Sequence, residues 1–403
     1  MPDPLRVRFT GPLSPFAQSF AIELARHGYR PSAVANQLRL IAHLSRWLQA
    51  QHLDARHLTG AVLDKFLATR RAKGYVLWLS ARALTPFLDH LRHRGFQLPP
   101  PSNSEPSPSE ELLDRYRTYL LNVRGIADTT ARGYVDTVRP FVVGRARDGQ
   151  LDWAGLTGAD VIAFVHSATR HLAIGSAQLL GTALRSLLTY LHIEGLLRRP
   201  LSAAVPSVAG SKHAGLPRAL EPGEVERLLA ACDRRTRTGR RNFAILMLLV
   251  RLGLRAGEVC TLRLDDLDWR AGELIVRGKG NRVERLPLPA DVGEALAAYL
   301  RRGRPATARG RTVFVRVHAP HRALTSSGIA GAVRTVASRA GVPAVTAHRL
   351  RHTVATRLVR AGASLPEISQ VLRHRRLLTT AIYAKVDREG LRQLARRWPG
   401  GAP

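Results

Sequence analysis

The pattern of apolar and polar positions divides the chain into segments with different predicted structures. Residues 16–25 and 33–47 repeat apolar side chains with the period of an α-helix, and helical patterning resumes at residue 110. Between them, residues 98–109 are dominated by proline and serine, a composition typical of a solvated linker. The first half of the chain is therefore predicted to contain two helical domains separated by this linker.

The two helical segments also resemble each other in sequence. Residues 53–66 align with residues 151–164, and residues 87–95 align with residues 187–195 at nearly the same offset. Two aligned blocks favour a duplicated helical domain over a chance match between leucine-rich helices.

The pattern changes after a second linker at residues 201–216. Residues 272–277 and 282–288 are predicted to form two strands around a hairpin turn at residues 278–281. A third short strand is predicted at residues 312–317, and helices are expected on both sides of these strands.

The predicted fold is therefore mainly α-helical, with a small antiparallel β-sheet in the C-terminal domain. The predicted order is a helical N-terminal domain, a linker, a second helical domain, a second linker and the C-terminal domain, at residues 1–97, 98–109, 110–200, 201–216 and 217–403.

The charge of the chain points to a polyanionic partner. The sequence contains 62 Lys and Arg against 30 Asp and Glu, which gives a net charge of +32. Residues 217–403 contain 36 basic and 15 acidic side chains, so this domain alone carries +21. A genome-wide bias toward arginine is the alternative explanation, but the size of the charge favours nucleic acid.

The cysteine content and the lack of targeting signals exclude several classes of protein. The only two cysteines, Cys232 and Cys260, are predicted to be buried free thiols, and they cannot form a disulfide framework or a cysteine-type zinc site. The N-terminus lacks the pattern of a signal peptide, and no apolar run approaches the ~20 residues of a membrane span. We therefore expect no membrane association and a cytoplasmic, nucleoid-associated location.

The C-terminal domain carries histidine, arginine and tyrosine at helical spacings. Arg351 and His352 follow His348 by three and four residues, so a helix places all three on one face. The next predicted helix leads to His374, and Tyr383 follows nine residues later. This arrangement suits charge stabilisation and proton transfer around one tyrosine hydroxyl.

Two groups further upstream are weaker signals when taken alone. Arg255 and Glu258 have a spacing that is common in surface ion pairs. Lys279 lies in the predicted hairpin turn, where a solvated lysine is the ordinary interpretation. This domain, however, contains 34 arginines and only two lysines, and an ammonium group can release a proton whereas a guanidinium effectively cannot.

The order and spacing of these groups resemble the tyrosine recombinases, also called the phage integrase family. The matching motifs are Gly-Leu-Arg-x-x-Glu at 253–258, Gly-Lys-Gly-Asn at 278–281, His-x-Leu-Arg-His at 348–352 and Leu-x-His-x8-Tyr ending at Tyr383. The resemblance covers residues 216–386, and four motifs in order are specific although each alone is weak. It implies that residues 110–200 are a SAM-like, core-binding helical domain and that residues 1–97 are an extra arm that duplicates it.

The resemblance implies a phosphate-binding role for several of these residues. Arg255 and Arg351 correspond to the two arginines that clamp the scissile phosphate, and His374 to a further phosphate contact. Glu258 corresponds to a residue that orients the first motif, and His352 to one that packs beneath the site.

Three more residues are implied to carry out the chemistry. Tyr383 corresponds to the nucleophile that forms a 3′-phosphotyrosine, His348 to the acceptor of its proton, and Lys279 to the donor that protonates the leaving 5′ oxygen. A tyrosine hydroxyl with an ordinary pKa near ~10 needs such assistance at neutral pH. Because guanidinium groups can stabilise the developing negative charge, no metal, ATP or other cofactor is expected.

The resemblance also implies the partners and leaves the biological role open. Double-stranded DNA is the predicted substrate, bound by a homo-tetramer, or a hetero-tetramer with related recombinases, on two synapsed sites. The extra N-terminal arm favours an integrase or transposase of a mobile element. A Xer-like resolvase of replicon dimers and a type IB topoisomerase are the alternatives.

One position departs from the family pattern. The family usually has glycine before the second-motif histidine, where this chain has Arg373. If a positive φ is needed there, arginine strains the backbone. We expect the helix turn to adapt and Arg373 to contact the DNA backbone, so that Arg349, Arg373 and Arg375 are the DNA-binding candidates.

Two further interpretations compete with the recombinase. A zinc site could use His348, His352 and His374, but Arg349 stands where a His-Glu-x-x-His motif needs glutamate, and cationic neighbours repel a dication. A catalytically inactive DNA-binding module would need only basic charge, whereas this chain carries the whole set of polar residues.

Overall fold

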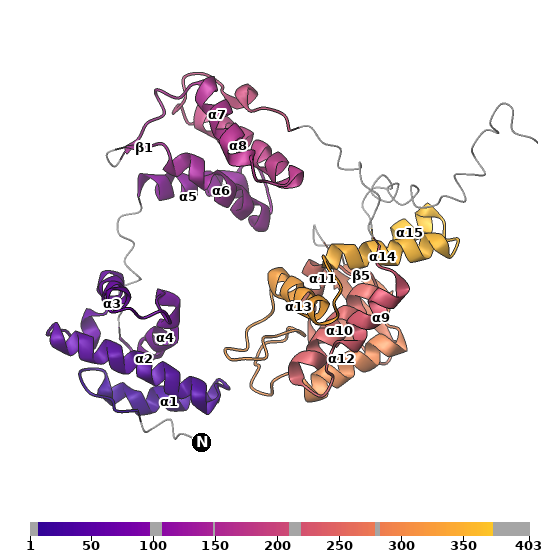
Figure 1. Cartoon of the computed structure of the whole chain (residues 1–403), viewed down its shortest axis with the longest axis horizontal. Coiled ribbons are helices and arrows are strands. Elements are labelled where there is room, and N and C mark those ends of the chain that lie inside the picture. The colour runs from indigo at the N-terminus through magenta and orange to yellow at the C-terminus, as the bar shows by residue number, and fades with distance from the viewer. Residues whose placement is uncertain (1–6, 97–106, 148–149, 209–218, 279–282, 374–403) are drawn as a thin grey trace, which may run out of the picture. The chain divides into compact units, whose positions relative to one another are not determined.

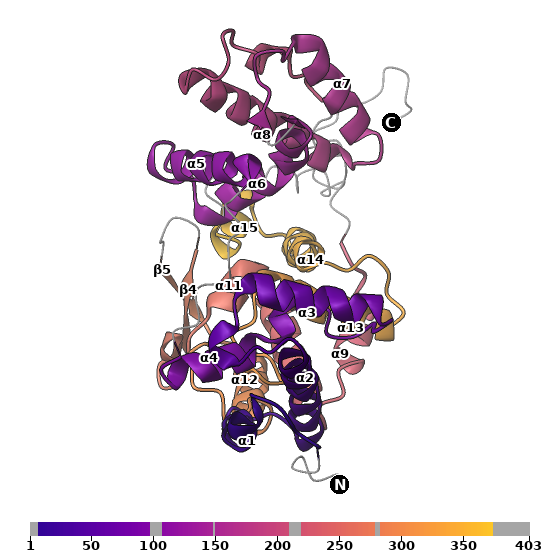
Figure 2. The ribbon, with the colours of Figure 1, turned by 90° about the vertical axis from the view of Figure 1, so that its left-hand side faces the viewer.

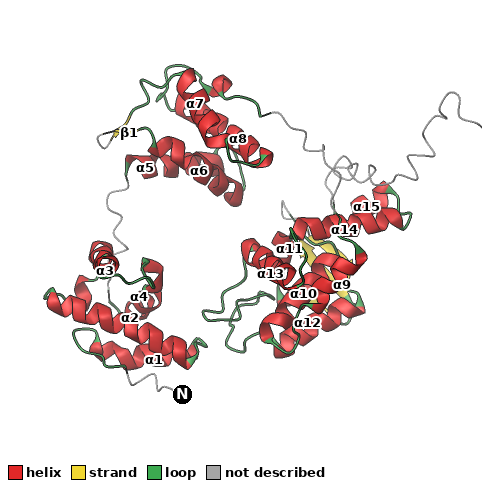
Figure 3. Ribbon diagram, viewed as in Figure 1, coloured by secondary structure: helices red, strands yellow, loops and turns green. Residues whose placement is uncertain are grey.

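The computed structural model describes residues 7–96, 107–147, 150–208, 219–278 and 283–373. The chain divides into two compact units, one containing residues 1–55, 82–95 and 215–403 and the other containing residues 56–81 and 96–214. Helices dominate both units, and the strands are short (Figure 3). Short 3₁₀ helices occur at Ser14–Phe16, Ala55–His57, Ala81–Ala83, Ser202–Ala204 and Leu264–Asp266.

The N-terminal part of the first unit contains α1 (Ala17–Arg26), α2 (Pro31–Ala50) and α4 (Thr85–His93) (Figure 1). Helix α1 packs against both α2 and α4. Phe20 and Phe87 meet edge to face across the α1–α4 interface, with ring centroids 5.1 Å apart. Beside them, buried His90 hydrogen-bonds to Glu23 and Ser19 of α1, so a polar cluster lies within this apolar interface.

In its described residues, the second unit contains five α-helices and a hairpin of two short strands. These elements are α3 (Gly60–Ala72), α5 (Pro108–Asn122), α6 (Asp128–Val143), α7 (Gly158–Thr169), α8 (Ile174–Ile193), β1 (Ala146–Arg147) and β2 (Gln150–Leu151). Helices α5, α6 and α8 pack on one another around a hydrophobic core that includes the buried rings of Tyr116 and Tyr190. The Thr157 side chain and Asp160 cap the start of α7 reciprocally.

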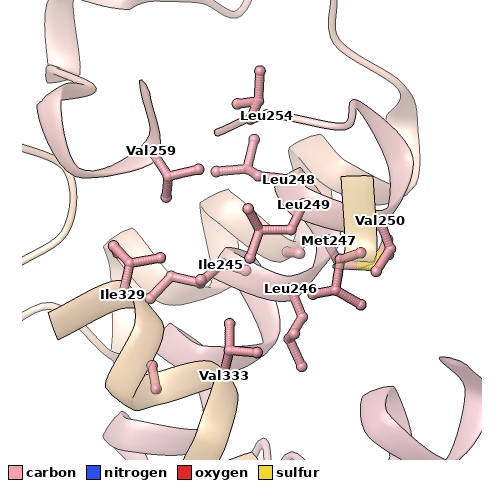
Figure 4. Packing of buried hydrophobic residues seen from close by; sticks show 14 of the residues in the cluster. Ile245, Leu246, Met247, Leu248, Leu249, Val250, Leu254, Val259, Ile329 and Val333 are labelled. Carbon is pink, nitrogen blue, oxygen red and sulfur yellow. The ribbon is translucent and has the colours of Figure 1, made fainter. Parts of the chain in front are cut away.

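The C-terminal part of the first unit is built around one buried helix, α10 (Arg237–Arg251). It packs against α12 (Ala290–Arg302), α13 (Ser326–Arg339) and α14 (Ala347–Arg360), and Figure 4 shows its side chains meeting Val259, Ile329 and Val333. The remaining helices are α9 (Pro222–Ala230), α11 (Ala256–Thr261) and α15 (Leu365–Val371).

Three antiparallel strands in the order β3-β4-β5 form the sheet of this part, at Leu267–Asp268, Glu273–Arg277 and Val283–Pro287. The β4–β5 hairpin can be followed in Figure 2. Its register pairs Glu273 with Pro287 and Arg277 with Val283. The turn of this hairpin, which contains Lys279, lies outside the described residues.

A small second core lies at the C-terminal end of the described chain. It contains Val354, Ala355, Ile368 and Leu372, and it is separate from the large core around α10. Leu350, one turn earlier in α14, belongs to the large core. Helix α14 therefore contributes to both cores.

The mainly helical fold with small antiparallel sheets and the two strands of the β4–β5 hairpin are confirmed. The strand predicted at residues 312–317 is wrong, because Thr312 and Val315 form only isolated bridges with Arg263 and Ala323. The third strand is instead β3, on the other side of β4. Cys232 is buried as predicted, whereas Cys260 is only partly buried. In the part of the chain that the structure describes, no helix is long and apolar enough to cross a membrane.

Candidate active site

Helix α14 presents the histidine-arginine motif. The Thr346 hydroxyl accepts a hydrogen bond from the Arg349 N–H and fixes the start of the helix. Leu350 and Val354 are buried on one side, which leaves His348 and His352 toward the surface at the spacing of one helical turn. The structure thus places the two histidines side by side on α14, as their spacing predicted.

Arg351 is the buried member of this motif, with 3 % of its surface exposed. Its Nη1 donates to the Gly253 carbonyl at 2.5 Å, and its Nη2 donates to the Leu372 carbonyl. These carbonyls belong to segments about a hundred and about twenty residues away in sequence. Arg351 therefore joins the loop before α11 to the end of α15.

Arg255 stands directly before α11 and is held by Glu258. The Arg255 N–H donates to Glu258 Oε2 at 2.9 Å, and Arg255 Nη1 donates to Glu258 Oε1 at 2.6 Å. The Arg255 side chain is 45 % exposed, whereas that of Glu258 is 5 % exposed. The arrangement is a buried carboxylate that orients a guanidinium facing solvent, which is more than the surface ion pair that the spacing alone suggests.

Glu258 is ionised in spite of its burial. Burial by itself raises the pKa of Glu258, but the hydrogen bond from the Arg255 backbone and the charges of Arg373 and Arg255 together hold this pKa below its ordinary value. A permanent negative charge therefore lies between two arginines.

Arg373 is the position where the chain departs from the glycine of the family pattern. Its backbone has φ of 55°, so arginine here adopts the left-handed conformation that glycine would adopt without strain. Its side chain is 5 % exposed and donates from Nη2 to Glu258 Oε2 at 3.0 Å. The guanidinium that was expected to contact DNA is thus buried against a carboxylate in this structure.

His348 and His352 form a contacting pair. Their Nε2 atoms lie 2.9 Å apart, so one ring donates and the other accepts. Burial, Arg351 and Arg255 lower the pKa of His348, while burial, His348 and Arg351 lower the pKa of His352 to about 4. Both imidazoles are therefore neutral at pH 7, and a neutral ring can accept a proton.

Arg349 is the remaining predicted site residue that the structure describes. Arg349 is partly buried, donates from Nη1 to the Pro343 carbonyl at 2.9 Å and lies 3.9 Å from Glu224. Lys279, His374, Arg375 and Tyr383 lie outside the described residues. Among the described residues there is no group of three His, Cys, Asp or Glu side chains that could hold a metal ion.

The described part of the site is a basic cluster around neutral imidazole. Arg255 and Arg351 both act electrostatically on His348, although these residues come from separate segments of the sequence. Guanidinium groups beside a proton acceptor can hold an anion while a proton is removed nearby. Sequence reasoning missed that Glu258 also binds Arg373, because a contact over 115 residues leaves no spacing signal.

The family of the chain follows from comparison with known proteins. Residues 218–389 match the model of the phage integrase family. An integrase/recombinase of Sinorhizobium fredii, y4rA, is 40% identical over 396 residues, covering 97% of this chain and 96% of that protein. The tyrosine recombinase XerD of Mycobacterium tuberculosis is 33% identical over 306 residues, covering 72% of this chain and 97% of XerD.

A solved structure supports the fold alone. The XerH site-specific recombinase bound to its palindromic difH substrate matches with a TM-score of 0.54 and 19% identity, covering 73% of this chain and 98% of XerH. The chain belongs to the phage integrase family of tyrosine recombinases. It is a DNA strand-transferring enzyme that acts in site-specific recombination.

Proposed function

We propose that this recombinase breaks and rejoins DNA through a covalent 3′-phosphotyrosine on Tyr383. The proposal rests on the cluster of Arg255, Arg351 and His348. These residues are distant in sequence, yet the charges of both arginines act on the His348 ring. Tyr383 stands at the spacing from this cluster that the family motifs require.

The proposed cleavage step balances without a cofactor. The Tyr383 hydroxyl oxygen attacks the phosphorus as its proton passes to His348. The bond between phosphorus and the 5′ oxygen breaks, and Lys279 supplies a proton to that oxygen. The new ester keeps the phosphodiester bond energy, so a 5′-hydroxyl can reverse the reaction on another strand without ATP.

The two arginines would lower the barrier of this step. Negative charge grows on the non-bridging oxygens during attack, and each guanidinium could contribute about 10²–10³ in rate by analogy with oxyanion-hole donors. His374 would add a further contact with the same phosphate. A low pKa keeps His348 ready to accept a proton at neutral pH.

Double-stranded DNA is the proposed substrate, and four protomers on two sites the proposed assembly, either as a homo-tetramer or with related recombinases. Support for DNA comes from the net charge of +32 and from relatives such as a λ integrase dimer bound to a COC′ core site. We further propose that residues 110–200 bind the core site, that residues 1–97 form an additional arm domain and that residues 217–403 are catalytic.

An integrase or transposase of a mobile element is the proposed biological role. The integrase/recombinase y4rA aligns with 97% of this chain, whereas XerD aligns with 72%. The extra length is thus shared with an integrase/recombinase rather than with XerD. A Xer-like resolvase is the second candidate, supported by the 33% identity to XerD.

Covalent trapping on a nicked recombination site tests the proposal. On such DNA the cleaved end diffuses away, so the protein–DNA ester accumulates. The wild-type protein should form this adduct, and Tyr383→Phe should form none while binding DNA as tightly. An undiminished adduct from Tyr383→Phe would remove Tyr383 from the nucleophile role.

A further inference from the structure

Arg373 occupies a backbone conformation that arginine rarely adopts. Its φ of 55° is in the left-handed region, where a Cβ atom crowds the following carbonyl and glycine is favoured. It directly precedes His374, the predicted phosphate contact. A strained residue beside a predicted site persists when its side chain is held by specific contacts.

The Arg373 side chain is hydrogen-bonded to one carboxylate and lies near a second. Its Nη2 lies 3.0 Å from Glu258 Oε2, and its Nε lies 3.9 Å from Glu284 Oε2 on β5. Both Arg373 and Glu258 are only 5 % exposed, so this pair is screened little by solvent. Arg373 thus links the start of α11 with the strand that follows the Lys279 turn.

The main chain at this point also holds the predicted phosphate-binding arginines. The Arg373 carbonyl accepts a hydrogen bond from Arg255 Nη2 at 3.3 Å. The preceding carbonyl, that of Leu372, accepts one from Arg351. Because φ at residue 373 sets how this segment turns, it also sets where these carbonyls point.

The contact between Arg373 and Glu258 changes the net charge around Arg255. Glu258 alone would neutralise Arg255 and weaken its attraction for a phosphate. With Arg373 on the same carboxylate, the hydrogen-bonded group of Arg255, Glu258 and Arg373 keeps a net positive charge. Glu284 is outside this group, because it lies 3.9 Å from Arg373, beyond hydrogen-bond distance, and is 39 % exposed. Glu258 can then orient Arg255 without cancelling its charge.

We propose that Arg373 is a positioning residue for Arg255, acting through Glu258. Its guanidinium shares the carboxylate, its carbonyl accepts a hydrogen bond from Arg255 Nη2, and it stands where the family pattern has a glycine without a side chain. The inference rests on the proposed function, since Arg255 is taken to contact the scissile phosphate.

The rate of covalent attachment to nicked site DNA, measured at saturating protein, tests this role. Arg373→Gly relieves the backbone strain but removes the charge, and it should slow attachment about tenfold, less than the loss of a direct donor, with DNA affinity unchanged. Arg373→Lys keeps the charge and should recover most of the rate. Arg360→Gly is the matched control, because Arg360 is an exposed residue at the end of α14 and lies 3.8 Å from Glu221.

A second substrate separates charge from simple structural support. A methylphosphonate at the scissile position lacks one negatively charged oxygen, so the defect of Arg373→Gly should shrink on it. A defect of equal size on both substrates would show a merely structural role. An Arg373→Gly rate equal to that of the wild type, or an Arg373→Lys rate as low as that of Arg373→Gly, would overturn the proposal.

The same measurements distinguish this inference from the proposed function. If the wild-type protein forms no adduct that depends on Tyr383, the proposed function fails. If the wild-type adduct forms and Arg373→Gly makes it at the same rate, only the role of Arg373 fails.

Discussion

Two histidine clusters in this protein are built in opposite ways. In the N-terminal helices, His90 is 2% exposed and its Nδ1 contacts the Glu23 carboxylate, while its Nε2 lies 3.0 Å from the Ser19 hydroxyl. In α14, His348 is exposed and Arg351 and Arg255 act on it. A carboxylate and a hydroxyl satisfy the first ring, whereas partial burial together with two cations keeps the second ring neutral.

The comparison shows that the partners of a histidine decide whether it has a structural or a chemical role. The His90 cluster has the Ser-His-Glu hydrogen-bond order of a hydrolytic triad, yet Ser19 also donates to the carbonyl of Phe16, the residue directly before α1, at 3.1 Å. That cluster is a polar contact that joins α1 and α4. The α14 cluster instead leaves a neutral ring at the surface among guanidinium groups, which is an arrangement suited to proton transfer at an anion.

The largest expected effect separates the two clusters by activity. His348→Gln should slow covalent attachment to nicked DNA by about 10²–10⁴, the usual contribution of a general base. His90→Gln should leave the rate of the bound protein unchanged. Equal losses in both variants, measured in a single turnover, would mean that His348 has no special role in proton transfer.

The second expected effect separates them by stability. His90→Leu leaves Glu23 and Ser19 without their buried partner, so it should destabilise the α1–α4 interface by about 1–3 kcal/mol. His348→Gln changes an exposed side chain and should cost less than about 0.5 kcal/mol. Amide exchange in α1 and α4 measures the first loss, and exchange in α14 provides the matched comparison.

The pH dependence of cleavage gives a third test. Because the pKa of His348 lies below its ordinary value of 6.5, more than half of the proton acceptor is still neutral at pH 6.5. Attachment should therefore remain near its neutral rate at pH 6.5 and decline only in more acidic solution. A rate that halves at or above pH 6.5 would contradict a lowered pKa of His348.

Several features of this site were accessible from the sequence. The spacing of His348, Arg351 and His352 predicted a shared helix because helical geometry depends only on local periodicity. The alternation in β4 and β5 likewise predicted the hairpin. These features need no knowledge of distant contacts.

Other features were not accessible because they depend on tertiary packing. The segment at residues 312–317 has strand-like composition, but its neighbours offer only isolated bridges. The Glu258–Arg373 pair joins residues 115 positions apart, so no local pattern announces it. Arg373 also adopts a positive φ against the backbone preference of arginine, a conformation that its sequence neighbours do not predict.

The smallest expected effect concerns acid stability. The histidines give Glu23 a pKa below its ordinary value of 4.5, although burial opposes this shift. A lowered carboxylate pKa adds stability above pH 4.5 that is lost as the pH falls through the folded-state value. The protection of the amides of α1 and α4, corrected for the slower intrinsic exchange in acid, should therefore fall below pH 4.5 in the wild type.

Glu23→Gln is the control for this effect, because it removes the titrating group and should flatten the acid dependence in those two helices. The α14 pair also responds to acid, but through a different group. The unfolded state binds more protons at His352 between pH 6.5 and about 4, so α14 loses stability over that higher range. If α1 and α4 lost protection at a higher pH than α14, the proposed difference between the two histidine clusters would be contradicted.

The small core of α14 and α15 has a consequence for cooperativity within the C-terminal domain. Among the described residues, its fully buried members are Val354, Ala355, Ile368 and Leu372, far fewer than in the core around α10, so opening it exposes less apolar surface than unfolding α10. Arg351 hydrogen-bonds to the Leu372 carbonyl in this core and to the Gly253 carbonyl outside it. Loss of Arg351 would therefore remove a predicted phosphate contact and also divide one cooperative unit into two that open independently.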